Sequence, residues 1–266
     1  MARGGTGLDQ AVAFLTPLGG AAAPTPAAVP WFAAVGAVVG VCVGAVWYWS
    51  TEAFGPLVGA ALAVVADLVL TGMLHMDGLA DAADGLLPHV GTSGAAGAAR
   101  RLAIMADPST GAFGTIAVVA AALLRVSALA SIVTTISGSV LLVGALWAAS
   151  RATMAIGLTC LPYARAEGGL ATGFTGSDGR PARLTVRNGW HLAISLLALG
   201  AAGAALGAWH LRNGLAGFAI GTLCGVGVLA LGKRRLGGFT GDVLGASGVV
   251  LETVGLVAAA AHWSHL

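Results

Sequence analysis

WFAAVGAVVGVCVGAVWYWS, residues 31–50, is a run of twenty residues without a charged side chain. A helix that crosses the hydrocarbon core of a bilayer needs about 20 mostly apolar residues, so this run predicts one membrane span. Six later segments have the same character. We therefore predict an all-α fold, a polytopic integral membrane helical bundle, with residues 1–266 forming a single domain. The predicted spans are Trp31–Ser50, Phe54–Leu74, Gly111–Thr134, Val140–Leu161, Gly189–His210, Gly214–Gly232 and Val243–Trp263.

The composition of the whole chain agrees with this prediction. Apolar residues make up 57% of the 266 positions and charged residues 9%, and the mean hydropathy is +0.89. A soluble domain carries about 25% charged residues, so the excess apolar surface must face lipid. This excludes a soluble enzyme, a disordered chain and a nucleic-acid binder built on a basic patch. A lipid bilayer is the expected surrounding, and both a monomer and a homo-oligomer stay open.

Basic residues in the predicted loops are distributed unequally between the two sides of the membrane. Ten lie on the side of the N-terminus and one, Arg212, lies on the other side. Because loops rich in Lys and Arg stay in the cytoplasm, the N-terminus is predicted to be cytoplasmic and the C-terminus external. The ten are Arg3, Arg100, Arg101, Arg165, Arg180, Arg183, Arg187, Lys233, Arg234 and Arg235.

An acidic cluster follows the second predicted span, on the cytoplasmic side. The stretch His75–Gly85 reads HMDGLADAADG, with Asp77, Asp81 and Asp84 spaced i, i+4 and i+7. On a helix these carboxylates lie within roughly 60° of one another. They repel each other unless a cation lies between them, and hard oxygen ligands favour Mg²⁺ or Mn²⁺. The alternative is a solvated acidic helix end.

Two further cytoplasmic motifs combine a carboxylate with glycines at a helix start. Asp107–Gly114 reads DPSTGAFG and precedes the third span, where its polar side chains can cap the helix or its backbone amides can hold a phosphate. Gly237–Asp242 reads GGFTGD and precedes the last span. Asp242 is placed as a further metal ligand. Glu252 lies about 15 Å deeper along that helix, where we expect it to pair with Arg151 or Arg125.

These motifs gather metal-binding carboxylates, phosphate-suited glycines and arginines on one face of the membrane. A divalent metal that bridges phosphate oxygens can orient and neutralise a phosphoryl group. The residues therefore predict phosphoryl or phosphodiester transfer at a cytoplasm-facing active site, without identifying the substrate.

The motifs, in this order, resemble those of the cobalamin synthase family, also called adenosylcobinamide-GDP ribazoletransferases. The similarity covers nearly the whole chain. It departs from the family pattern at Ala106, where a basic residue is common, at Pro108, and at Phe239, where glutamine is usual. The resemblance is carried by HMDGLAD with Asp84-Gly85, by Asp107–Gly114, by Tyr163-Ala164-Arg165 with Glu167-Gly168, by Gly237–Asp242 with Leu244-Gly245-Ala246 and Glu252, and by Ala13–Thr16 and Gly36–Gly44 near the N-terminus.

The resemblance implies the Mg²⁺-dependent final step of cobalamin assembly, in the cell membrane. Adenosylcobinamide-GDP would react with α-ribazole or its 5′-phosphate to give adenosylcobalamin or its 5′-phosphate and GMP. On this interpretation Asp84 or His75 accepts the hydroxyl proton, and Arg151 and Arg165 hold phosphate oxygens. The metal ligands would be Asp77, Asp81, Asp84 and Asp242, further substrate contacts would come from Asp107, Gly111, Glu167, Gly238 and Gly241, and Glu252 would be structural.

Two other functions stay open at this stage. A CDP-alcohol phosphotransferase also displays Asp-Gly-x-x-Ala on a cytoplasmic membrane helix, but it has arginine where this chain has Asp81. A secondary transporter could use the charges inside the spans, Asp67, Arg125, Arg151 and Glu252, as an ion path. Transporter sites lie near the bilayer midplane, however, and most of the acids here lie on one face.

The predicted topology can be tested with reporter fusions. Fusions at Gly94, Gly179 and Gly237 should all report a cytoplasmic location, because these positions lie in the loops that carry the basic residues. A fusion at the C-terminus should report an external location. A cytoplasmic C-terminus would show that the number of spans is even.

Overall fold

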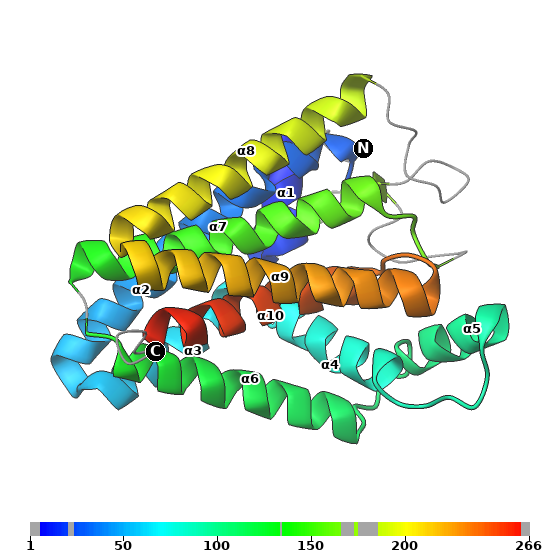
Figure 1. Cartoon of the computed structure of the whole chain (residues 1–266), viewed down its shortest axis with the longest axis horizontal. Helices are drawn as coiled ribbons and strands as arrows, with labels where there is room; N and C mark the ends of the chain where they lie inside the picture. Colours follow the sequence, from blue (N-terminus) through cyan, green and yellow to red (C-terminus); the bar gives the residue numbers. More distant parts are fainter. Residues whose placement is uncertain (1–5, 21–23, 134, 166–172, 175–185, 262–266) are drawn as a thin grey trace.

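The fold is a bundle of long helices, seen in a computed structural model that describes residues 6–20, 24–133, 135–165, 173–174 and 186–261 (Figure 1). The described residues contain no strand, only an isolated β-bridge between Tyr163 and Phe239. The helices are α1 (Gly7–Leu15), α2 (Phe32–Phe54), α3 (Pro56–Leu70), α4 (Leu74–Leu86), α5 (Gly94–Ile104), α6 (Ala112–Ser131), α7 (Ile136–Cys160), α8 (Val186–Trp209), α9 (Leu211–Leu236) and α10 (Gly241–Ala260), with 3₁₀ turns at Pro17–Gly19 and Pro26–Trp31.

Six helices in the described ranges are long and apolar enough to cross a membrane: α2, α6, α7, α8, α9 and α10. They confirm six of the seven predicted spans and the all-α membrane fold. Large apolar side chains such as Trp49, Leu197 and Leu223 point outward from the bundle, where they suit lipid. The helices α7 and α10 form its centre. In each of them 78% of the most apolar stretch is buried inside the bundle, against 22% to 28% in α6, α8 and α9.

The second predicted span, Phe54–Leu74, is not one continuous helix. The helix α3 ends at Leu70, and the chain turns by 89° into α4. The turn is made by Gly72 and Met73, whose φ angles are +59° and +61°. This left-handed conformation interrupts a helix, and it is uncommon for a residue with a side chain such as methionine. The pair α3 and α4 therefore counts as a seventh span only if the two arms are taken together.

Two glycine stripes bring the helices of the centre close to their neighbours. On α9, added Cβ atoms at Gly217, Gly221 and Gly225 would lie 2.8, 2.7 and 2.9 Å from backbone carbonyl oxygens of α10. On α2, Gly36, Gly40 and Gly44 approach carbonyl oxygens of α7 in the same way, at 2.6 Å each. Small residues at every fourth position allow such close backbone packing between membrane helices, where no hydrophobic effect drives association.

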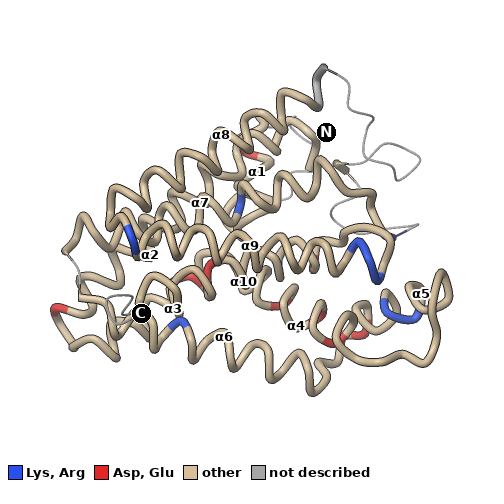
Figure 2. Tube along the Cα trace, in the orientation of Figure 1, with Lys and Arg blue, Asp and Glu red and all other residues tan. Residues whose placement is uncertain are grey.

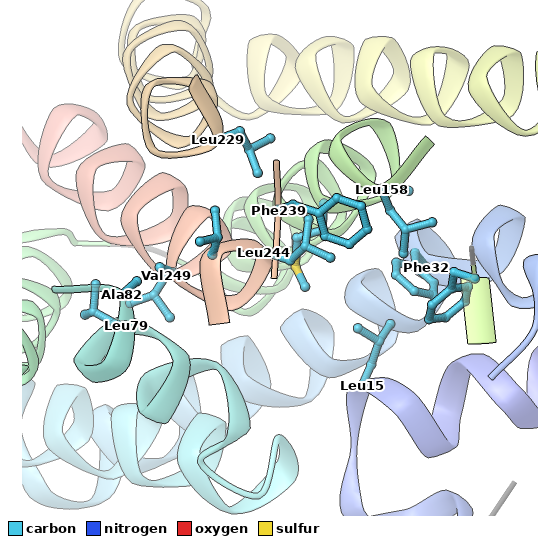
Figure 3. Close-up of a cluster of buried hydrophobic side chains, with 14 of the residues drawn as sticks. Leu15, Phe32, Leu79, Ala82, Leu158, Leu229, Phe239, Leu244 and Val249 are labelled. Atoms are coloured by element: carbon cyan, nitrogen blue, oxygen red, sulfur yellow. The ribbon is translucent and has the colours of Figure 1, made fainter. Parts of the chain in front are cut away.

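The helix α4 packs its apolar side into this bundle. Figure 3 shows Leu79 and Ala82 of α4 beside Val249 of α10, within one cluster of buried side chains. At its far end, Arg101 of α5 donates hydrogen bonds to the carbonyl oxygens of Gly85 (2.7 Å) and Pro88 (3.0 Å). Cationic donors at the last carbonyls stabilise a helix C-terminus.

The charged residues of α4, of α5 and of the end of α9 gather at one end of the bundle. Figure 2 shows the basic residues of α5 and of the end of α9 at that end, with the acids of α4 beside them. We call this the basic end. The first turns of α6 and α10 also lie there. The helix α6 begins after the short connection that follows α5, and α10 begins after the four residues that follow the end of α9.

The glycine packing predicts opposite effects for two substitutions in the same helix. Gly221→Ala places a Cβ 2.7 Å from the Leu251 carbonyl oxygen, so α9 and α10 must separate. We expect the free energy of unfolding to fall by about 1–3 kcal/mol. Gly227→Ala meets no atom within 4 Å and should raise it by up to about 1 kcal/mol through helix propensity. Denaturant titration in mixed micelles measures both, and equal effects would contradict the packing argument.

Candidate functional site

The close crossing of α4 and α10 places three carboxylates at the basic end. A Cβ at Gly78 would lie 3.0 Å from the carbonyl oxygen of Asp242, so the two backbones nearly touch. Asp77 and Asp81 flank this crossing on α4, which is not one of the six helices long and apolar enough to cross a membrane. Burial raises the pKa of Asp81 to about 6, and repulsion from Asp242 and Asp77 adds to the rise. The three carboxylates therefore share one electrostatic environment.

Asp242 itself is held by two neighbours. Its carboxylate forms an ion pair with Arg165 at 2.9 Å, with each side chain about one quarter exposed, and it accepts a hydrogen bond from the Thr240 hydroxyl at 3.2 Å. The same hydroxyl caps α10 by accepting from the amide of Val243. The pair is partly shielded from solvent, so it is more than a surface contact.

Arg165 reaches Asp242 because two loops are joined behind it. The amide of Phe239 donates to the carbonyl of Pro162 (2.9 Å), and the amide of Ala164 donates to the carbonyl of Phe239 (2.8 Å). Gly238 is required here, since a Cβ would lie 2.0 Å from the Pro162 oxygen. The fully buried Phe239 ring packs against Tyr163 at 5.4 Å. This apolar contact accounts for Phe239 where the family pattern has glutamine.

A pocket of about 240 Å³ opens between these elements, and we call it the α4–α10 pocket. Two of its lining residues carry a buried nitrogen, His75 Nε2 and Arg165 Nε, that has no hydrogen-bond partner in the described part of the chain. Buried polar groups are normally paired, so an unpaired one calls for an explanation such as a ligand. The lining residues are Phe14, Leu74, His75, Asp77, Met154, Tyr163, Arg165, Gly241, Asp242 and Gly245.

Asp84 has a different environment from Asp77 and Asp81. It is buried, and its two oxygens accept hydrogen bonds from the backbone amides of Gly111 (2.7 Å) and Gly114 (2.9 Å) at the start of α6. A negative charge is favoured at a helix N-terminus. The anion at these amides is therefore the protein's own carboxylate. Asp107 lies nearby on the surface, where hydrogen bonds from the side chain and then the amide of Ser109 lower its pKa.

A second group of charged residues is buried between the spans. Arg125 binds Asp67 and Glu252, both at 2.7 Å. Glu252 also pairs with Arg151, so it contacts both of the arginines that the sequence offered as partners. The Ser150 hydroxyl donates to Glu252 at 2.6 Å, and the Trp147 indole N–H donates to Asp67 at 2.7 Å. Two arginines and two carboxylates balance in charge, which is how such groups are tolerated in a membrane. These are the charges that an ion path would need, and here they bind one another.

The structure thus separates the predicted site residues into three places. His75, Asp77, Arg165, Gly241 and Asp242 line the α4–α10 pocket, with Asp81 and Gly238 beside it. Asp84, Gly111 and Asp107 lie at or before the start of α6, and Arg151 and Glu252 belong to the buried network. Glu167 lies outside the described residues.

The sequence alone did not identify the apolar side chains that line the pocket, and it did not show which partners the charged site residues bind. Phe14 of α1 and Met154 of α7 line it, and Phe14 was visible only as part of an N-terminal motif. In the described ranges, no three His, Cys, Asp or Glu side chains converge closely enough, as they stand, to hold a metal ion. A shared ion would require the carboxylates of Asp77, Asp81 and Asp242 to turn toward one another.

Comparison with known proteins identifies the family. A family model described as cobalamin-5-phosphate synthase matches residues 8–260. The adenosylcobinamide-GDP ribazoletransferase of Mesorhizobium japonicum is 36% identical over 240 residues, which cover 88% of this chain and 83% of that protein. The proteins of the same name from Chlorobium phaeovibrioides and Desulfitobacterium hafniense are 32% and 35% identical, and the alignments cover 84% and 86% of this chain and 82% and 84% of theirs. No solved structure gives a significant match.

The contacts of Asp84 predict a loss of stability on its substitution. Asp84→Asn removes one acceptor from the start of α6 and leaves a buried amide unpaired. We expect the free energy of unfolding to fall by about 1–3 kcal/mol. Asp77→Asn is the control, because Asp77 is exposed and lies on the same helix. Thermal unfolding in detergent compares the two, and equal stability of both variants would contradict the role of Asp84 at α6.

Proposed function

This chain belongs to the cobalamin-5-phosphate synthase family, and from that membership we propose that it completes cobalamin assembly as an adenosylcobinamide-GDP ribazoletransferase. Its substrates would be adenosylcobinamide-GDP and α-ribazole or α-ribazole 5′-phosphate. The products would be adenosylcobalamin, or its 5′-phosphate, and GMP. The curated relatives that carry this activity in their names align with most of this chain.

One observation in the structure supports this chemistry: the residues that line the α4–α10 pocket combine carboxylates with buried nitrogen atoms that have no partner among the described residues. Asp77 and Asp242 line the pocket together with His75 and Arg165. Carboxylates attract a divalent cation, and buried nitrogen donors attract phosphate oxygens. A diphosphate with its metal ion carries both kinds of group, and the acceptor substrate needs only a hydroxyl beside it.

The reaction is a substitution at phosphorus. The ribazole hydroxyl oxygen forms a bond to the phosphorus that carries cobinamide. The bond from this phosphorus to the bridging oxygen breaks, and that oxygen leaves with its electron pair as part of GMP. The hydroxyl proton passes to a base in the site or to water. Arg165 holds Asp242 through one terminal nitrogen, which leaves its Nε–H for a phosphate oxygen.

We propose Mg²⁺ as the metal and Asp77, Asp81 and Asp242 as its ligands. The donor set fits, because all three supply hard oxygens. Burial is the main cause of the raised pKa of Asp81, and repulsion from Asp242 and Asp77 adds to it, so a cation between the three would be favoured. Asp84 is left out of the set, since both of its oxygens already accept backbone hydrogen bonds. When bound, Mg²⁺ would neutralise charge on the diphosphate.

We further propose that the site faces the cytoplasm of a cell in whose membrane the chain is embedded. The pocket is lined by the first turn of α10, at the basic end of the bundle. Ten of the eleven basic residues in predicted loops belong to that side. Basic loops remain cytoplasmic, so substrates made in the cytoplasm would reach the pocket without crossing the membrane.

The metal proposal predicts which carboxylates are essential. Asp77→Asn, Asp81→Asn and Asp242→Asn should each lower the rate of GMP release about 10²-fold or more, as expected when an electrostatic contact in a transition state is lost. Their Mg²⁺ dependence should also shift to higher concentration. Glu52→Gln is the control, because Glu52 is exposed near the end of α2 and far along the chain from the site. Activity close to that of the control in two of the three variants would contradict the shared metal.

A further inference from the structure

His75 occupies an unusual position among the pocket residues, with one ring nitrogen bound to the protein and the other unpaired. The side chain is 5% exposed. Its Nδ1 lies 3.4 Å from a terminal nitrogen of Arg151. Its Nε2 is buried, and no residue in the described part of the chain bonds to it. His75 lines the α4–α10 pocket together with Asp242 and Arg165.

The contact with Arg151 determines which ring nitrogen carries the proton. A guanidinium group has only N–H donors and cannot accept a hydrogen bond. Nδ1 must therefore be the acceptor, with its lone pair directed at Arg151. In a neutral imidazole the hydrogen then lies on the other nitrogen, Nε2. A second proton would place a cationic ring against a buried guanidinium, which is electrostatically unfavourable.

Arg151 is itself held so that it cannot turn away. Its other terminal nitrogen bonds to Glu252 and to the hydroxyl of Ser150. Gly36 of α2 covers its aliphatic stem, at a distance where an added Cβ would be 2.9 Å from the Arg151 Cγ. The chain of contacts runs from Glu252 through Arg151 to His75. It leaves Arg151 inside the network rather than in the pocket, where it would have to lie to bind phosphate.

We propose that His75 donates a hydrogen bond from Nε2–H to an anionic oxygen in the α4–α10 pocket, and that Arg151 is a positioning residue that sets this tautomer. The identity of the oxygen, on the diphosphate of the substrate, rests on the proposed function. A nitrogen that carries hydrogen can neither accept the hydroxyl proton nor coordinate Mg²⁺. This role replaces that of the base suggested from the sequence and keeps His75 out of the metal ligands.

The tautomer can be tested without turnover. In the full-length protein with ¹⁵N-labelled histidine, the resonances that disappear in His75→Gln belong to His75. They should show Nε2 protonated and Nδ1 unprotonated. In Arg151→Lys, where the charge near Glu252 is kept and the fixed guanidinium donor is lost, this single tautomer should give way to a mixture. Inorganic pyrophosphate should shift the Nε2 resonance of the unmodified protein. A protonated Nδ1, or an Nε2 resonance that does not respond to pyrophosphate, would overturn the proposal.

Two isosteric variants provide the test in the reaction. The amide nitrogen of His75→Gln reaches the place of Nε2, whereas that of His75→Asn reaches only the place of Nδ1. If Nε2–H is a donor, the Gln variant should release GMP at least about tenfold faster than the Asn variant, the difference expected for one hydrogen bond to a charged group. Equal and complete loss in both folded variants would indicate a base and overturn the proposal. A correct tautomer and pyrophosphate response in a protein that never releases GMP would instead refute the proposed function alone.

Discussion

Arg125 lies in the middle of an apolar bundle, and its charge is acceptable there only because Asp67 and Glu252 both bind it at 2.7 Å. The three residues belong to α6, α3 and α10, and Arg151 of α7 joins them through Glu252. Four helices therefore meet at one depth. Leaving one such charge unpaired is far costlier than losing an apolar contact, so these pairs determine how the helices align along their axes, while the glycine stripes determine how closely they pack.

The position of the site depends on this network through Asp67. Its carbonyl oxygen accepts hydrogen bonds from the amide (2.9 Å) and the hydroxyl (2.7 Å) of Thr71, the residue that ends α3. The left-handed pair Gly72 and Met73 follows at once. The bend that sends α4 across α10 therefore starts from a residue whose side chain is held by Arg125. An altered pairing in the bundle would displace the α4 carboxylates relative to Asp242.

Local properties of the chain predict most of the fold and half of the site. Long apolar runs are sufficient to locate six spans, and the spacing of the acids is sufficient to place Asp77 and Asp81 on one face. The bend at Gly72 and Met73 is not visible, because an apolar span and a broken one have the same composition. The partner of Asp84 is also hidden, since the Gly111 and Gly114 amides lie 27 and 30 residues away. Only the packed structure decides such pairings.

The helical spacing of the three α4 carboxylates conceals three different environments, and their order has a consequence. Asp77 is exposed, Asp81 is half-buried and Asp84 is buried against α6. The first turn of α4 is fixed by His75 and Arg151, and its last turn is fixed by Asp84 and the arginine donors at its C-terminus. Asp77 and Asp81 are thus carried on a helix that is held at both ends, while no backbone group in the described residues bonds to their own oxygens. A site arranged in this way holds its charges in position before a ligand arrives, which is the arrangement that makes electrostatic stabilisation effective.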